Sequence, residues 1–425
     1  MKQAGLLILF ILLLVNLSAA ETELDNNNQR LKISFSERFR YVTWDNAITL
    51  NDEAKAGFSF TRHRTSLMGQ WYPSDSLELA LKLTNEFRYY FSPDDRDFNF
   101  NEIFIDQLYL KWKNPLNIHG SLTLGRQNII LGEGFLVMDG EPLVGSRSIY
   151  FNAARFDWHI KEDKELTLFY LYQPEYDNII PIINDRNTLL IEKPEESFGI
   201  YYKTFKKNLK YDVYYIRKNI KKTDTSPSHY ENNTIGLRFD DHSPEINPLS
   251  CKFEAAYQFG KSNDNNISAA GGYFEVIRNN NWTQKYLPKN ISVGIIYLSK
   301  NWDPLFSRWP KWSESYIYTQ IKESKVAYWS NLVAITSGMD FIFDKNISFT
   351  FDYLHLIAAK TVDLKYGFIN TRNNTRGNLF ISKLDYKINK YFTGHFLWEY
   401  FIPGNFYFSE ADSYNWFRFE LMYKI

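Results

Sequence analysis

The sequence predicts an all-β protein: a single antiparallel transmembrane β-barrel of roughly 16–18 strands that follows a cleaved signal peptide. Three observations support this prediction. The chain opens with an apolar export signal, aromatic residues make up 18% of it, and apolar and polar residues alternate in one segment after another. A strand that alternates in this way can turn one face to lipid and the other to a polar lumen.

The first 20 residues have the three parts of a secretory signal peptide. Lys2 carries the charge, Leu6 to Val15 form an apolar run, and Ser18-Ala19-Ala20 supplies small residues for cleavage. The run is shorter than the ~20 apolar residues of a membrane-spanning helix. No Cys follows the small residues, so we do not expect a lipid anchor. We expect residues 1–20 to be removed and residues 21–425 to form one outer-membrane barrel domain.

The composition narrows the class of exported protein. With 30 Tyr, 34 Phe and 11 Trp, the chain has more aromatic surface than a soluble domain needs. Cys251 is the single cysteine, which excludes an internal disulfide and therefore a bridge-stabilised secreted domain. The formal net charge of zero gives no overall attraction to nucleic acid, which we do not expect as a partner.

Alternation with a period of two is the main structural signal. It is clear in residues 33–41, 77–88, 235–240 and 252–259, where apolar residues alternate with charged or small polar ones. In the second of these segments, Leu79 and Leu81 lie on the opposite face from Lys82. A water-soluble sandwich would show the same pattern, so alternation alone does not require a membrane.

The end of the chain discriminates between these two solutions. Phe417, Phe419, Leu421, Tyr423 and Ile425 alternate with charged residues and Met422 up to the last position. This resembles the terminal strand of bacterial outer-membrane barrels, although their habitual final residue is Phe. Tryptophans near proposed strand ends fit an interfacial girdle: Trp112, Trp158, Trp302, Trp329, Trp398 and Trp416. We therefore expect a location in the bacterial outer membrane, with its lipid and the barrel-assembly machinery as partners.

The cost of charge in lipid predicts the side of each arginine. An Arg that faces lipid near the midplane costs ~2–4 kcal/mol, so Arg38, Arg40 and Arg88 should point into the lumen with the polar face of their strands. The same parity places Arg155 inside. In residues 108–112 and 122–126 the parity is mixed, and the sides of Asp106 and Arg126 stay open.

The stretch from Leu122 to Ile160 is the strongest functional signal. It brings Arg126, Arg147 and Arg155 close together in sequence around one glycine-rich connection, as the basic mouth of a pore would require. The alternative for any single Arg is a pair with a nearby carboxylate. The candidates for such pairs are Glu133, Asp139, Glu141 and Asp157.

Short motifs in this stretch and beyond it resemble a known family. They are Phe60-Thr61-Arg62-His63-Arg64, Leu124-Gly125-Arg126-Gln127 followed by Gly132 and Gly134, Ser146-Arg147-Ser148, Asn152-Ala153-Ala154-Arg155, Asp303-Pro304-Leu305-Phe306 and Ser330-Asn331-Leu332. On these motifs the chain resembles the alginate-export outer-membrane barrels. The resemblance implies a monomeric barrel that passes an acidic exopolysaccharide outward, with periplasmic secretion proteins as further partners. It assigns the pore lining to Arg62, Arg64, Arg126, Arg147 and Arg155, and parity adds Arg38, Arg40 and Arg88.

Three functions remain open. The first is a channel for an anionic polysaccharide, an alginate-like polyuronate, or for another anionic solute, because a ring of guanidinium groups attracts carboxylates without one deep site. The second is a general or nutrient-uptake porin on the same scaffold. The third is a non-conducting structural or adhesive barrel. Trp302 to Trp312 is a candidate for an inward-folding gate, with a rigid surface loop as the alternative.

We expect neither an enzyme nor a bound cofactor or metal. His395 and Glu399 share a strand face but lie ~13 Å apart at ~3.3 Å per residue, too far to bind one metal ion together. Gly132-Glu133-Gly134 lacks the third glycine of a dinucleotide fingerprint. An outer-membrane lipase would need a Ser/His site, for which His159 and His395 are the candidates.

Overall fold

The computed structural model describes most of the chain after the expected signal peptide. The described residues are 24–26, 29–47, 49–94, 96, 100–138, 150–187, 191, 194–206, 209–220, 229–241, 248–282, 284–307, 330–361 and 372–425. The expected signal peptide, residues 1–20, lies outside them, as do Arg147 and Trp329.

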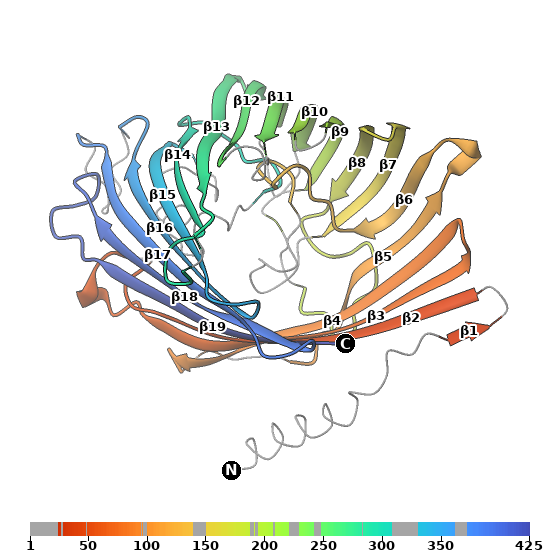
Figure 1. Cartoon of the computed structure of the whole chain (residues 1–425), viewed down its shortest axis with the longest axis horizontal. Helices are drawn as coiled ribbons and strands as arrows, with labels where there is room; N and C mark the ends of the chain where they lie inside the picture. The colour runs from red at the N-terminus through yellow and green to blue at the C-terminus, as the bar shows by residue number, and fades with distance from the viewer. Residues whose placement is uncertain are drawn as a thin grey trace, which may run out of the picture.

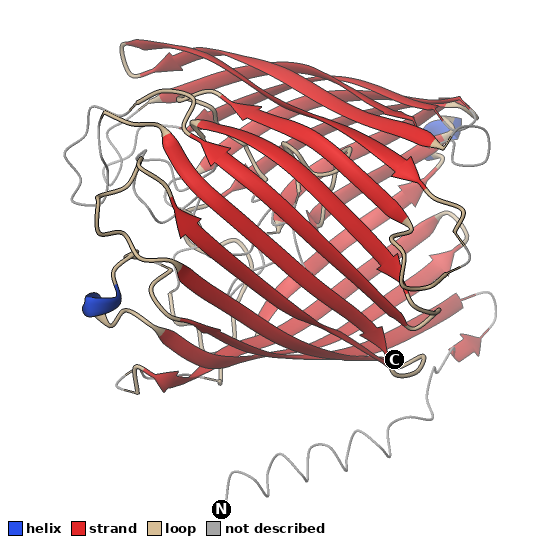
Figure 2. Cartoon of the chain, turned by 60° about the vertical axis from the view of Figure 1, so that its left-hand side comes forward, coloured by secondary structure: helices blue, strands red, loops and turns tan. Residues whose placement is uncertain are grey.

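The described residues form one closed antiparallel sheet (Figures 1 and 2). Its strands are β1 (Leu24–Asn26), β2 (Gln29–Trp44), β3 (Phe58–Ser74), β4 (Leu77–Ser92), β5 (Phe104–Lys113), β6 (Gly120–Gln127), β7 (Phe151–Lys161), β8 (Lys164–Gln173), β9 (Glu195–Lys206), β10 (Leu209–Ile220), β11 (Tyr230–Asp241), β12 (Leu249–Ser262), β13 (Asn265–Asn279), β14 (Asn290–Leu298), β15 (Leu332–Ile342), β16 (Ile347–Ile357), β17 (Thr375–Lys387), β18 (Phe392–Pro403) and β19 (Tyr414–Lys424).

In the described chain, β2 to β19 make an 18-strand barrel, which confirms the predicted fold class. Each strand pairs with its neighbours in sequence, and β19 closes the ring by pairing with β2. The short β1 pairs with β2. Two 3-10 turns, η1 (Asp52–Ala54) and η2 (Pro115–Asn117), lie in connections. Within the described residues, no helix is long and apolar enough to cross a membrane.

The alternation has the predicted orientation. On β4, Leu79 and Leu81 are 36% and 41% exposed on the outer surface, whereas Ala80 and Lys82 are 3% and 5% exposed. Leucines can cover the outside because lipid is their solvent there, while polar side chains find partners in the lumen. The pattern therefore sorts each strand into a lipid face and a lumen face.

The two ends of the barrel differ. Strands are joined by short turns, such as residues 75–76 and 162–163, at the end where the C-terminus lies, and by long connections, such as 128–150 and 299–331, at the other end. We call these the short-turn end and the long-loop end. Figure 2 shows the strands running obliquely between them.

Two long connections contribute apolar segments to the interior. Phe135 stacks on Trp302, with ring centroids 5.3 Å apart, and both pack with inward-facing residues of the wall such as Tyr273. The Phe306 N–H donates to the Leu136 oxygen at 2.9 Å, which joins the two segments. Trp302 is therefore a buried residue of this inner cluster, and Trp416 is buried too, so their assignment to an interfacial girdle is wrong.

Removal of the last strand, from Trp416 onward, should abolish assembly. Without this strand, β2 and β18 would each expose an unpaired backbone edge in lipid, where no water can satisfy it. The truncated chain should lose the heat-dependent gel shift of a folded barrel in isolated outer membranes. A truncated chain that kept the shift would contradict the closure by β19.

Candidate functional site

Arginines occupy neighbouring inward positions on three adjacent strands. Arg40 on β2 is in register with Arg62 on β3, which is in register with Arg88 on β4. We call these three residues the arginine row. Like charges directly opposite each other destabilise a sheet, so this arrangement is costly unless something with negative charge lies nearby.

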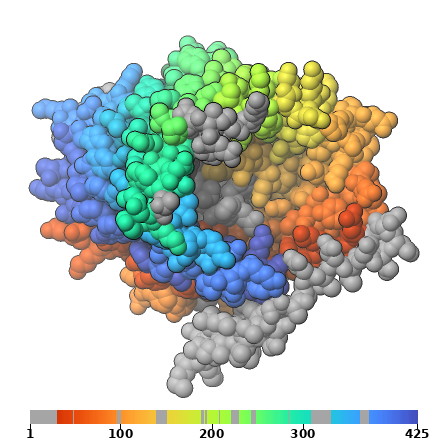
Figure 3. All heavy atoms as spheres, in the orientation of Figure 1, coloured from red at the N-terminus to blue at the C-terminus, as the bar shows by residue number. Residues whose placement is uncertain are grey.

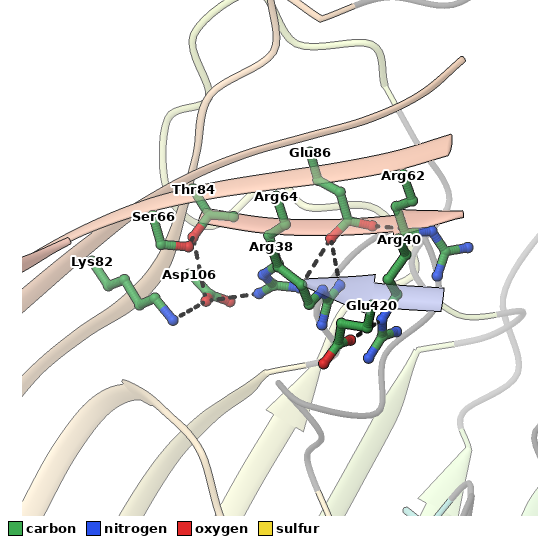
Figure 4. A network of polar contacts seen from close by, with 10 residues as sticks. All are labelled: Arg38, Arg40, Arg62, Arg64, Ser66, Lys82, Thr84, Glu86, Asp106 and Glu420. Carbon is green, nitrogen blue, oxygen red and sulfur yellow. Dashed lines mark hydrogen bonds and ion pairs between the residues drawn. The ribbon is translucent and has the colours of Figure 1, made fainter. Parts of the chain in front are cut away.

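Carboxylates lie beside Arg40 and Arg62 of the row (Figure 4). Glu86 accepts from Arg64 at 3.0 Å and lies 3.8 Å from Arg38 and 4.0 Å from Arg62. Arg40 is paired with Glu420 of β19, and Asp106 of β5 is paired with Arg64 at 3.0 Å and with Lys82 at 3.3 Å. This network has five cationic side chains and three carboxylates, so positive charge is in excess in it; the cations are Arg38, Arg40, Arg62, Arg64 and Lys82.

Burial and aromatic contacts hold the guanidinium groups in place. Arg38, Arg40, Arg62 and Arg64 are between 2% and 6% exposed, and Arg88 is more accessible. The Phe60 ring lies 5.7 Å from the guanidinium carbon of Arg62 and 5.2 Å from that of Arg88. Both cations lie against the same ring, and this cation–π contact favours their side-by-side arrangement.

The mixed parity around Asp106 and Arg126 has a structural cause. The pairing of β4 with β5 shifts register between Lys82 and Leu83, and Gly125 on β6 has a φ of +119°. A Cβ on Gly125 would lie 2.3 Å from the Leu108 oxygen, so the irregular backbone needs a glycine there. After these irregularities, Asp106 and Arg126 are both buried on the inner side.

Arg126 is committed to a structural contact. Its guanidinium donates to both carboxylate oxygens of Asp177, at 2.7 Å and 3.3 Å, and to the Ile105 oxygen at 2.7 Å. The Tyr150 ring lies 3.8 Å from its guanidinium carbon. Arg126 therefore binds the 174–187 connection to the wall, away from the arginine row.

The structure brings together five of the eight predicted pore-lining arginines. Arg38, Arg40, Arg62, Arg64 and Arg88 share one wall. Arg155 lies on another wall, where it pairs with Asp157 at 2.9 Å, the alternative weighed for it above. Arg147 is outside the described residues.

A second charged group, which sequence analysis missed, holds the inner segments on the opposite side. Arg238 of β11 contacts Asp212 at 3.1 Å and Glu133 at 3.6 Å, and Lys252 of β12 contacts Glu133 at 2.8 Å. Glu133 belongs to the connection after β6, so these contacts tie that inner segment to β11 and β12. Strand parity gave the inward side of Arg238, but nothing in the sequence pointed to Glu133 as its partner.

The structure describes only part of the candidate gate, Trp302 to Trp312. Asp303 exchanges two hydrogen bonds with the Gln258 side chain, at 2.6 Å and 2.9 Å, and lies 3.5 Å from Lys218. Residues 302–307 therefore fold inward and are fastened to β10 and β12, whereas residues 308–312 lie outside the described residues. Figure 3 shows that the ring of strands is hollowed at its centre.

The two histidines weighed for a lipase site have acidic neighbours. The Nε2 atom of His395 accepts from Arg418 at 2.8 Å, and its Nδ1 lies 3.4 Å from Glu420. His159 lies 3.3 Å from Glu165. Among the residues that the structure describes, no group of three or more His, Cys, Asp or Glu side chains could hold a metal ion.

Comparisons with known proteins support the fold. No protein-family model and no curated protein matches the chain. Acinetobacter baumannii OccAB4 is 10% identical, with 94% of this chain and 100% of that one covered and a TM-score of 0.61. Pseudomonas aeruginosa OpdQ is 12% identical, with 93% and 98% covered and a TM-score of 0.59. Pseudomonas aeruginosa OccK2 (OpdF), in complex with glucuronate, is 11% identical, also with 93% and 98% covered and a TM-score of 0.59.

These neighbours correct one prediction and confirm another. They are Occ and Opd outer-membrane porins, so the resemblance to alginate-export barrels is wrong. The short motifs misled because several serve the scaffold: Arg126 binds Asp177, and Arg376 donates to the backbone oxygens of Ser330 and Asn331. The predicted location in the bacterial outer membrane is confirmed.

Replacing Arg126 by Gln should destabilise the barrel without acting on the arginine row. Removing one partner of a buried ion pair leaves Asp177 with uncompensated charge and costs about 3–5 kcal/mol. The free energy of unfolding, measured by urea titration in lipid vesicles, should fall by that amount. The matched control, Arg155→Gln, removes a more exposed pair and should cost about 1 kcal/mol or less. Equal losses in the two variants would contradict the structural role of Arg126.

Proposed function

We propose that the chain is an outer-membrane porin that takes up small anionic solutes, with the arginine row as its anion site. One observation carries the proposal: Arg40, Arg62 and Arg88 stand side by side on the lumen face of adjacent strands. Glu86 and Glu420 offset only part of the positive charge around the row, so an anion in the lumen is attracted to it.

The geometry suits passage better than tight binding. A guanidinium group binds a carboxylate through two parallel hydrogen bonds, so each arginine of the row offers one such contact. Arg88 is the most accessible of the three to a solute in the lumen. Glu86 and Glu420 compete for the same donors, which keeps each contact weak enough for the solute to leave.

The structural neighbours favour a small solute. OccK2, which has a similar fold, was solved in complex with glucuronate, a single sugar acid. The inner cluster of Phe135 and Trp302 also occupies part of the lumen in this chain, which favours compact cargo over a thick polymer. A small carboxylate is therefore the solute class that we propose.

A non-selective porin is the second candidate. This candidate is supported by carboxylates on the opposite side of the lumen, where Asp212, Glu254 and Glu133 lie near Arg238. A lumen with both signs of charge can let anions and cations pass alike. The two candidates differ in one measurable quantity, the anion-to-cation permeability ratio.

Replacing Arg40, Arg62 and Arg88 together by Gln should lower that ratio. We expect roughly a fivefold decrease, equivalent to about 1 kcal/mol of lost attraction. The measurement is the reversal potential of the purified protein in a planar bilayer under a salt gradient. The wild-type preference should also weaken as the salt concentration rises, because ions screen the row.

The control is Arg155→Gln, which removes one lumen-side arginine outside the row and should leave the ratio close to that of the wild type. Each variant is first checked for the heat-dependent gel shift of a folded barrel. A triple variant with the wild-type ratio would reject the row as the anion site. A wild type without anion preference would support the non-selective porin.

A further inference from the structure

Polar side chains lie on the lipid-facing side of β2 and β3, where none is expected. Glu37, His63 and Thr65 alternate with the inward arginines Arg38 and Arg64, so they point outward. The Thr65 hydroxyl donates to one oxygen of Glu37, and Nδ1 of His63 lies 3.7 Å from the other. We call these three residues the outer polar cluster.

The cluster lies inside the apolar band of the outer surface. Phe35 and Phe39 flank Glu37 on the same face of β2, and Leu67 follows Thr65 on β3 with 48% of its surface exposed. The His63 ring stacks on Phe87 of β4, with centroids 4.8 Å apart. Ionisable groups among lipid-facing apolar residues are unfavourable, so a cluster in this position indicates contact with protein in place of lipid.

An apolar hollow adjoins the cluster. Gly69 is four residues from Thr65 on the same face of β3, and a Cβ there would meet no atom within 4 Å. The hollow has a volume of about 570 Å³. Its lining includes Leu31, Trp71, Leu79, Leu81, Leu108 and Leu124. Trp71, 41% exposed, stands at its edge, so this face presents a hole and a protruding ring side by side.

We propose that the outer face of β2–β5 binds a second copy of this chain about a two-fold axis. A two-fold contact brings the same patch of both copies together, so the patch must be complementary to itself. This face is complementary to itself in two ways. It carries both a carboxylate, on Glu37, and an imidazole, on His63. It also carries both a hollow and the exposed ring of Trp71. A lipid acyl chain could fill the hollow but has no group to pair with Glu37 or His63.

The two features act together in the proposed contact. Gly69 lets the surfaces approach closely, and polar side chains between them form hydrogen bonds that lipid cannot replace, as in other membrane-protein contacts. The proposal does not depend on what the lumen transports, and it replaces the monomer expected from the sequence resemblance.

Disulfide trapping in outer membranes tests the contact. The full-length protein would carry Cys251→Ser together with Leu67→Cys, which places a thiol between the cluster and the hollow. The matched control carries Cys251→Ser with Val293→Cys, a residue of β14 that is 56% exposed on the outer face. Mild oxidation should give a covalent dimer for Leu67→Cys and at least fivefold less for Val293→Cys.

A third variant adds Gly69→Leu to the Leu67→Cys protein. The leucine should fill the hollow from within, leave the barrel folded by its heat-dependent gel shift, and reduce the dimer yield at least fivefold. Equal trapping at Leu67→Cys and Val293→Cys would reflect random collision and would overturn the proposal. So would the absence of any dimer, or trapping that Gly69→Leu leaves unchanged.

Discussion

Closure of the sheet within lipid is the constraint on which the rest of the structure depends. Backbone groups in the bilayer have no water to bond with, so every strand must be paired on both sides, and β19 must meet β2. Closure gives each strand one face toward lipid and one toward the lumen. The period of two in the sequence then decides which side chains are enclosed, and this is why so many charged residues gather inside.

The enclosed charged residues form two groups on different walls of the lumen, and the two groups make different contacts. On β2 to β4 the arginines are held by carboxylates and by Phe60 but remain in excess, which suits an anion in transit. On β10 to β12 the charges fasten the inner segments through Glu133 and Asp303. The arginine row and the inner segments fastened by Glu133 and Asp303 thus lie on opposite sides of the lumen.

Sequence analysis succeeded where the physical rule is local and strict. Alternation, together with the cost of Arg in lipid, predicted the inward side of Arg38, Arg40 and Arg88, and the terminal pattern from Phe417 to Ile425 predicted the membrane. It left the side of a residue open where the backbone breaks the alternation, as at Gly125, and it did not identify partners distant in sequence, such as Asp177 for Arg126.

The family resemblance failed for a related reason. In this chain a short stretch with glycine and arginine serves the scaffold, because Gly125 adopts a positive φ and Arg126 forms a buried ion pair with Asp177. The position of Trp302 in the sequence was misleading in the same way. A tryptophan near a strand end is compatible both with a lipid interface and with an inward-folding segment, and only its contact with Phe135 distinguishes the two.

The central claim is that the arginine row is an anion site within the lumen. Its most direct test is a crystal of the protein soaked in bromide, with the ion located by anomalous diffraction. The account predicts a bromide peak in contact with the guanidinium groups of Arg40, Arg62 or Arg88. Bromide found elsewhere in the lumen, with no peak along the row, would contradict it.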